Sequence, residues 1–152
     1  MVWSTKISLT MFLLDNELNL AYPANQLDNI FSLVADARDV VIDIEGPNHR
    51  PVSTTVADIN VTQLVEKYDD SVDVWCMQIY RGRSFGSLFA DYATRSTKPL
   101  FITEHGVDAY DSVNNREDQQ AQAEYAENLW KEMIANSSIC SGGAIFAYVD
   151  EV

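Results

Sequence analysis

Two glutamates stand directly after apolar runs of the sequence. Glu17 lies in the segment LLDNELN and Glu104 in LFITEHG. In parallel α/β proteins, functional groups gather at the carboxyl ends of strands, where burial and neighbouring charges can tune a carboxyl group. Such a pair can serve as acid, base or nucleophile. Taken singly, each glutamate has an ordinary alternative, because polar residues at strand ends often cap the chain or pair with a basic side chain.

Five short apolar runs predict the strands that would hold these glutamates. They are rich in β-branched and aromatic residues, as buried parallel strands are, and they span residues 7–14, 52–57, 72–79, 100–103 and 143–148. Helical spacing of apolar residues between them predicts helices at residues 27–34, 61–68, 86–95 and 117–133. Asn60 stands at the expected N-cap of the second helix. We expect the polar stretch 108–122 to be a loop that enters the last helix.

This alternation of strands and helices predicts an α/β fold with a parallel sheet and right-handed crossovers. Two architectures accept five such strands: a complete open doubly wound domain, or strands four to eight of a (β/α)8 TIM barrel. The length of 152 residues favours the open sheet, because a full barrel takes roughly 250 residues. The polar residues at the strand ends favour the barrel. On these grounds both architectures remain open.

The segments around the two glutamates resemble the barrel domains of clan A retaining glycoside hydrolases, the clan that includes family 2. In that clan an Asn-Glu pair ends strand four and a second Glu ends strand seven, which Asn16-Glu17 and Glu104 match. The other strands fall into order as well: PNHRPVSTTVAD resembles the fifth, VDVWCMQIYRG the sixth and GGAIFAYVDE the eighth. The resemblance therefore covers nearly the whole chain, and it implies that residues 1–152 form part of a catalytic TIM barrel domain.

The resemblance implies a retaining β-glycosidase, which cleaves O-glycosidic bonds by double displacement or transfers the sugar to another saccharide. This mechanism needs an ionised nucleophile and a protonated acid, with the two carboxyl groups about 5 to 5.5 Å apart. Glu104 corresponds to the nucleophile and Glu17 to the acid/base. A saccharide is therefore the expected partner, and no cofactor is expected.

Four further residues are implied as substrate-binding. Asn16 corresponds to the residue that hydrogen-bonds the sugar 2-hydroxyl, and Tyr80 to the tyrosine that holds the nucleophile. Tyr148 stands where relatives carry a tryptophan platform for the sugar, although packing at a strand end explains a tyrosine there equally well. His105 follows the nucleophile directly and is expected to contact the ligand.

Three positions depart from the pattern of the clan. Asp15 replaces the glycine that commonly precedes the Asn-Glu pair, and Gln78 stands where an asparagine is usual. Ala147 stands where an acidic residue often occurs in the eighth strand. These changes leave the sugar and linkage preference open.

Composition excludes several classes of partner. The chain has 10 basic and 23 acidic residues, a net charge of −13, and no basic patch, so binding to nucleic acid or to an anionic membrane surface is not expected. Its longest apolar stretch is far shorter than the roughly 20 residues that a membrane-spanning helix needs. With two histidines and no acidic cluster at metal-ligand spacing, no metal site is expected.

The remaining residues give weaker information. Cys76 and Cys140 permit one internal disulfide, but their apolar surroundings favour buried free thiols. Trp75 and Trp3 are assigned to the core and His49 to a loop. Two N-x-[ST] sequons, at residues 60–62 and 136–138, are compatible with a secretory or extracellular location.

Strands one to three of such a barrel have no counterpart in the sequence. Because five strands cut from a barrel leave two open edges, we expect the 152 residues to need the N-terminal half of the barrel and to be inactive alone. Three hypotheses follow: a glycosidase, a carbohydrate-binding pseudoenzyme without turnover, and an unrelated open α/β domain. The glycosidase hypothesis requires Glu17 and Glu104 to converge at one edge of the sheet.

Overall fold

The computed structural model describes residues 10–147. The predictions for Trp3 and Tyr148, and the outer ends of the first and last predicted strands, lie outside the described residues. The strands are β1 (Phe12–Leu13), β2 (Val52–Ser53), β3 (Thr55–Ala57), β4 (Trp75–Gln78), β5 (Leu100–His105), β6 (Tyr110–Asp111), β7 (Arg116–Glu117) and β8 (Cys140–Ile145). The α-helices are α1 (Leu18–Ala21), α2 (Leu27–Glu45), α3 (Val61–Tyr68), α4 (Leu88–Ala93) and α5 (Gln119–Ala135), with 3-10 turns η1 (Ala24–Gln26) and η2 (Asp69–Ser71).

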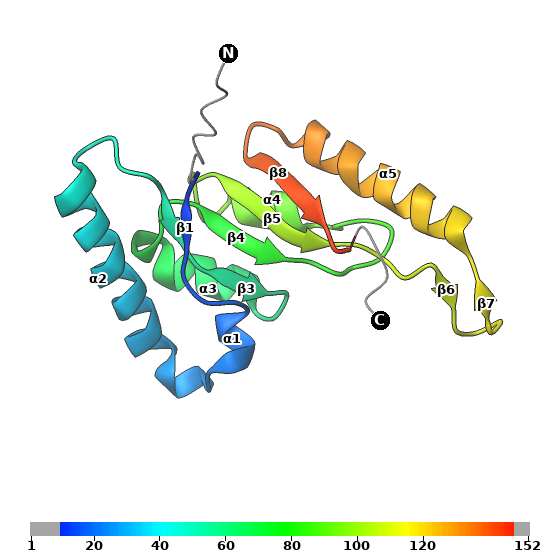
Figure 1. Ribbon diagram of the computed structural model, residues 1–152, viewed down its shortest axis with the longest axis horizontal. Coiled ribbons are helices and arrows are strands. Elements are labelled where there is room, and N and C mark those ends of the chain that lie inside the picture. Colours follow the sequence, from blue (N-terminus) through cyan, green and yellow to red (C-terminus); the bar gives the residue numbers. More distant parts are fainter. Residues whose placement is uncertain (1–9, 148–152) are drawn as a thin grey trace, which may run out of the picture.

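The main sheet is parallel, and its strands follow one another in chain order. Four strands pair in the order β3-β4-β5-β8, and β1 pairs in parallel with β2. A doubly wound sheet instead reverses its strand order at a switch point, and residues 10–147 show no such reversal. The mixed α/β structure with its parallel sheet confirms the predicted fold class, and the strand order is compatible with part of a barrel (Figure 1).

The helices pack on one face of the sheet around a single core. Phe31 of α2 stacks on Tyr68 of α3, with ring centroids 4.0 Å apart, and also contacts Trp75 of β4 at 6.1 Å. Trp75 is fully buried, which confirms its assignment to the core. The same cluster takes in residues of β5, α4 and α5, such as Ile102, Leu88, Leu129 and Met133. Because side chains alternate along a strand, the residues between these sheet positions face away from the helices.

Most predicted elements are confirmed, and several features differ. The predicted strand 52–57 is divided into β2 and β3, which belong to different sheets, and α2 runs on to Glu45, beyond the predicted residue 34. The short helix α1 was not predicted. The stretch 108–122, predicted as a loop, contains the β6–β7 hairpin and the start of α5. The hairpin forms because the Asp111 carboxylate accepts the backbone N–H groups of Val113 and Asn114, at 3.1 and 3.2 Å, and so closes the turn. Asn60 is the N-cap residue of α3, as predicted, but its side chain makes no capping hydrogen bond. Its backbone is left-handed, with a φ of 52°.

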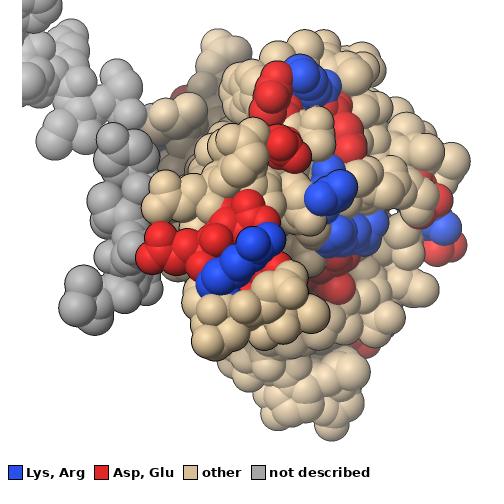
Figure 2. Space-filling view, turned by 90° about the vertical axis from the view of Figure 1, so that its right-hand side faces the viewer, with Lys and Arg blue, Asp and Glu red and all other residues tan. Residues whose placement is uncertain are grey.

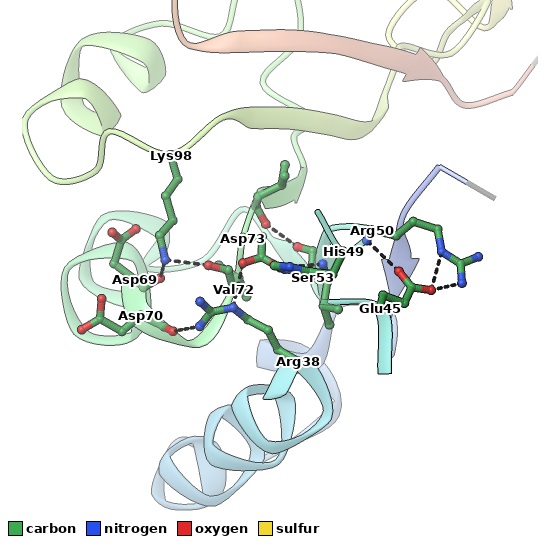
Figure 3. A network of polar contacts seen from close by, with 12 residues as sticks. Arg38, Glu45, His49, Arg50, Ser53, Asp69, Asp70, Val72, Asp73 and Lys98 are labelled. Atoms are coloured by element: carbon green, nitrogen blue, oxygen red, sulfur yellow. Dashed lines mark hydrogen bonds and ion pairs between the residues drawn. The ribbon is translucent and has the colours of Figure 1, made fainter. Parts of the chain in front are cut away.

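The N-terminal edge of the sheet is held by an ionic network around Asp73 (Figure 3). The Asp73 carboxylate accepts from Arg38 Nε at 2.7 Å, His49 Nε2 at 3.1 Å and the Val52 backbone N–H at 2.9 Å. His49 lies in a loop, as predicted. The network therefore joins α2, the approach to β2 and the approach to β4.

Both cysteines are buried free thiols, as predicted. Burial raises the pKa of Cys76 to about 11, so its thiol stays protonated and unreactive. Within residues 10–147, no helix is long and apolar enough to cross a membrane.

Candidate functional site

A bulge at the end of β5 sets the direction of Glu104. Met77 of β4 is in register with Ile102, but the next β4 residue, Gln78, is in register with Glu104, which leaves Thr103 as an extra residue on β5. A bulge of this kind re-aims the side chains that follow it. Regular alternation would have placed Glu104 on the helix-covered face with Ile102. The bulge instead turns it to the open face, beside Gln78.

Both oxygens of the Glu104 carboxylate accept hydrogen bonds from neutral donors. Gln78 Nε2 donates to Oε1 at 2.6 Å, and the Tyr80 hydroxyl donates to Oε2 at 2.7 Å. The pKa of Tyr80 is raised above its ordinary value by burial, by the hydrogen bond to Glu104, and by the charges of Glu104 and Glu17. Tyr80 is therefore a permanent donor, and both glutamate side chains lie within electrostatic reach of its hydroxyl.

Asn16 and Glu17 are tied to the same strand ends. The second amide proton of Gln78 goes to Asn16 Oδ1 at 2.6 Å. The Thr55 hydroxyl of β3 accepts the Glu17 backbone N–H at 2.9 Å and lies 3.3 Å from Asn16 Oδ1. One polar chain thus runs from Thr55 through Asn16 and Gln78 to Glu104.

The turn that carries the Asn-Glu pair has an uncommon backbone. Asp15 and Glu17 have φ values of 70° and 48°, in the left-handed region that side chains other than glycine rarely adopt. Such strained residues concentrate at functional sites, where surrounding contacts hold them. The left-handed φ at Asp15 also explains why a glycine would suit this position.

The structure brings together Asn16, Glu17, Tyr80 and Glu104 and leaves His105 apart. His105 alternates with Glu104 along β5, so it faces the helices, is 1% exposed and meets the edge of the Phe85 ring at 5.9 Å. Burial lowers the pKa of His105, which keeps the imidazole neutral. Tyr148 lies outside the described residues.

Two residues of the cluster were not predicted as site residues. Gln78 was noted only as a departure from a family pattern, and Thr55 was not singled out. Both are buried polar residues, Gln78 at the end of β4 and Thr55 at the start of β3, and a buried polar side chain needs a partner. That need is the signal in the sequence that could have identified them.

The two glutamates of the site lie outside the ion pairs that occur among the described residues. Among residues 10–147, neither Glu17 nor Glu104 pairs with a lysine or arginine, whereas six other acidic–basic pairs occur. In the same range, no group of three or more His, Cys, Asp or Glu is arranged to hold a metal ion. Figure 2 views the molecule from the side toward which the sheet strands point and shows acidic and basic patches interspersed there.

Comparison with known proteins gave matches only among solved structures: no family model and no curated protein matches the sequence. A GH2 β-galacturonidase from Eisenbergiella tayi matches with a TM-score of 0.51 and 16% identity, over 78% of this chain and 22% of that one. A β-glucuronidase from Ruminococcus gnavus matches with a TM-score of 0.50 and 18% identity, over 66% and 20%. A β-glucuronidase from an uncultured Clostridium gives 0.49 and 22%, over 67% and 20%.

At these identities the likeness shows the fold alone. The chain spans about a fifth of the length of the solved structures that it matches. Its fold is therefore similar to one part of larger glycoside hydrolases, including a member of family 2.

Proposed function

We propose that this chain carries the two catalytic carboxyl groups of a retaining β-glycosidase, with Glu104 as nucleophile and Glu17 as acid/base. The observation that carries the proposal is the setting of Glu104: both oxygens are held by neutral donors, and no cation among the described residues neutralises the carboxylate. Such a carboxylate is oriented, yet its charge stays available to a developing positive centre. Asn16 and Glu17 reach the same strand ends through Thr55 and Gln78.

The proposed reaction has two displacements. Glu104 attacks the anomeric carbon of a β-linked sugar while Glu17 protonates the departing glycosidic oxygen, which leaves a glycosyl ester on Glu104. Glu17 then takes a proton from water or from an acceptor hydroxyl, whose oxygen displaces Glu104 and restores the original anomeric configuration. Gln78 and Tyr80 hold the nucleophile, and the Asn16 side chain is assigned to the sugar 2-hydroxyl.

The partial TIM barrel is part of the same proposal. Sequential parallel strands with a single helix-covered face are what strands four to eight of such a barrel require. The two outer helices also carry exposed apolar side chains: Leu33, Val40 and Ile44 on α2, and Trp130 and Ile134 on α5. Further βα units packed against these helices would cover them. Activity is accordingly proposed for the complete gene product.

The test combines conservative variants with chemical rescue in the complete gene product. Glu104→Gln and Glu17→Gln are each expected to lower the rate of aryl β-glycoside hydrolysis by roughly a thousand-fold or more. Azide added to Glu104→Ala should restore turnover and yield the α-glycosyl azide, because azide then attacks in place of the missing nucleophile. Azide added to Glu17→Ala should yield the β-glycosyl azide, because it then attacks the glycosyl ester.

A matched control is Glu66→Gln, which makes the same change at an exposed position of α3 and should leave the rate unchanged. A Glu104→Gln variant with near-normal turnover would overturn the proposal. So would tight saccharide binding by a wild-type protein that releases no sugar, which is the behaviour of a binding protein without catalysis.

A further inference from the structure

The connection from β5 to α5 builds a second wall beside the proposed nucleophile. After Glu104 and His105 the chain passes through Gly106–Asp108 into the β6–β7 hairpin, which projects from the end of the sheet below the start of α5 (Figure 1). The hairpin is braced: the Asp118 N–H donates to the Ala109 carbonyl at 2.7 Å, and Gln122 Nε2 donates to the Val107 carbonyl at 3.1 Å. It is therefore a fixed part of the surface.

Two hollows join along this connection. The first, of about 470 Å³, lies beside Tyr80 and is also lined by Phe146, Val107 and Asp108. The second, of about 480 Å³, lies between the hairpin and α5 and shares Val107 and Asp108 with the first. The two hollows therefore adjoin at Val107 and Asp108, and the first lies beside Tyr80, whose hydroxyl contacts Glu104.

The far hollow has the residue types that bind sugars. Tyr110 is half-exposed, and its ring is oriented by a hydrogen bond from its hydroxyl to Asn115 Oδ1 at 2.5 Å. Tyr125 forms the opposite wall, with the Arg83 guanidinium 4.7 Å from its ring centroid. Aromatic rings offer a flat apolar surface for the C–H face of a sugar. The charged groups around them can hydrogen-bond the sugar hydroxyls: carboxylates accept from them, and a guanidinium donates to them.

We infer that this far hollow is a further saccharide subsite, which takes a sugar unit of a neutral β-linked oligosaccharide beyond the unit bonded at Glu104. The inference rests on the proposed function. The charge of the hollow favours a neutral sugar. Among the residues that the structure describes, Asp108, Asp111 and Asp118 line the hollow together with one cation, Arg83, and the chain as a whole carries a charge of −13. A polyanionic sugar chain would meet net repulsion there.

The test measures how affinity depends on oligosaccharide length, in the complete gene product with Glu104→Gln added to prevent turnover. Cellotetraose is expected to bind roughly tenfold more tightly than cellobiose, since stacking on one oriented ring can supply a factor of that size. Tyr110→Ala should remove this gain. Tyr125→Leu should also remove it, from a position on α5 outside the hairpin.

Two controls isolate the hollow. Val113→Ala changes the tip of the same hairpin, where the side chain is 91% exposed and lines neither hollow, and it should keep the full gain. Tetramannuronic acid, which is β-1,4-linked and anionic, should show no gain over dimannuronic acid. A tetrasaccharide gain that survives both Tyr110→Ala and Tyr125→Leu would overturn the subsite, and an equal gain for the anionic series would overturn its neutral class.

Measuring turnover as well as affinity distinguishes a failure of this inference from a failure of the proposed function. Hydrolysis of an aryl β-glycoside by the protein with Glu104 intact, together with no length-dependent gain, would overturn the subsite alone. A length-dependent gain that Tyr110→Ala abolishes, in a protein without any turnover, would support the subsite and overturn the proposed catalysis.

Discussion

The carboxylates at the two ends of the parallel strands are held in different ways. We call the side where the strands begin the N-terminal edge and the side where they end the C-terminal edge. At the N-terminal edge, Asp73 is shared between two basic side chains, Arg38 and His49, and a backbone N–H (Figure 3). At the C-terminal edge, the donors to Glu104 among residues 10–147 are the Gln78 amide and the Tyr80 hydroxyl. Both oxygens of each carboxylate accept hydrogen bonds, so the difference between the two edges is one of charge.

This difference indicates that Asp73 stabilises the fold, whereas Glu104 has the setting that the proposed reaction needs. Burial alone would raise the pKa of Asp73, but the Val52 N–H, His49 and Arg38 together hold it below its ordinary value. The negative charge of Asp73 is therefore balanced by Arg38 and by its other hydrogen-bond donors within the fold. Neutral donors hold both oxygens of Glu104, and no basic side chain among residues 10–147 compensates its charge, as the proposed catalysis requires. In β/α barrels the N-terminal face generally serves stability and the C-terminal face the reaction.

Apart from the two glutamates themselves, the largest effect on activity is expected from Gln78→Glu. This change replaces an amide that donates to both Asn16 and Glu104 with a group that accepts, and it places a second carboxyl group beside Glu104. We expect kcat/KM for an aryl β-glycoside to fall by roughly a hundred-fold to a thousand-fold, the loss typical of one misplaced catalytic contact. Steady-state kinetics of the complete gene product measures it.

Gln63→Glu is the matched control, since it makes the same change at an exposed position of α3 and should leave kcat/KM unaltered. If Gln78→Glu kept wild-type kinetics, Gln78 would have no part in orienting the nucleophile, and the C-terminal edge would resemble the N-terminal edge in serving the fold alone.

The largest effect on stability is expected from Asp73→Ala. Its removal leaves Arg38, His49 and the Val52 N–H without their shared acceptor. We expect the free energy of unfolding to fall by about 3 kcal/mol at neutral pH, as for other partly buried ion pairs that lose one partner. The kcat/KM of the folded protein should change by less than about two-fold, because the network lies at the edge opposite the site. Denaturant titration measures the first quantity.

The pH dependence gives this prediction a sign. Because the pKa of Asp73 is lowered by folding, its stabilisation is present above its ordinary value of 3.8 and is lost as the pH falls below it. The gap between wild type and Asp73→Ala should therefore narrow below pH 3.8. Asp39→Ala, at an exposed position of α2, should change stability by less than about 0.5 kcal/mol at any pH. A gap as wide in acid as at neutral pH would contradict the role assigned to the Asp73 charge.

The sequence carried most of the information on the fold. The helical spacing of apolar residues predicted α3 over its full length. Short apolar runs rich in β-branched residues predicted strands such as β4 and β5, because runs of this length and composition are typical of buried strands. It did not reveal the β6–β7 hairpin. That hairpin depends on a single side-chain-to-backbone turn at Asp111 within a polar stretch that has no apolar alternation.

The site was predictable in its residues and not in its geometry. The positions of Glu17, Asn16 and Tyr80 beside Glu104 follow from strand ends that meet at one edge. The direction of Glu104 depends on the Thr103 bulge, which adds one residue relative to β4 and so exchanges the faces of Glu104 and His105. No local signal in LFITEHG distinguishes a bulged strand from a regular one. His105 was expected at the ligand because it directly follows Glu104, and its burial against the helices could not be predicted.

The smallest effect is expected at the turn before the Asn-Glu pair. Asp15 has a φ of 70° and is partly accommodated because its own carboxylate accepts the Asn16 N–H at 2.7 Å. Glycine adopts this backbone without steric cost, so Asp15→Gly should raise the free energy of unfolding by about 0.5 kcal/mol. Asp15→Ala, which has neither the freedom nor the hydrogen bond, should lower it by about 1 kcal/mol.

The same substitution on a helix should have the opposite sign. At exposed Asp39 of α2 the backbone is helical, and glycine there only adds freedom to the unfolded chain, so Asp39→Gly should lower the free energy of unfolding by a few tenths of a kcal/mol. Denaturant titration of the four variants, Asp15→Gly, Asp15→Ala, Asp39→Gly and Asp39→Ala, measures these effects directly. If Asp15→Gly proved less stable than Asp15→Ala, the left-handed turn would not be the constraint at this position. The C-terminal edge would then carry less backbone strain than its φ values indicate.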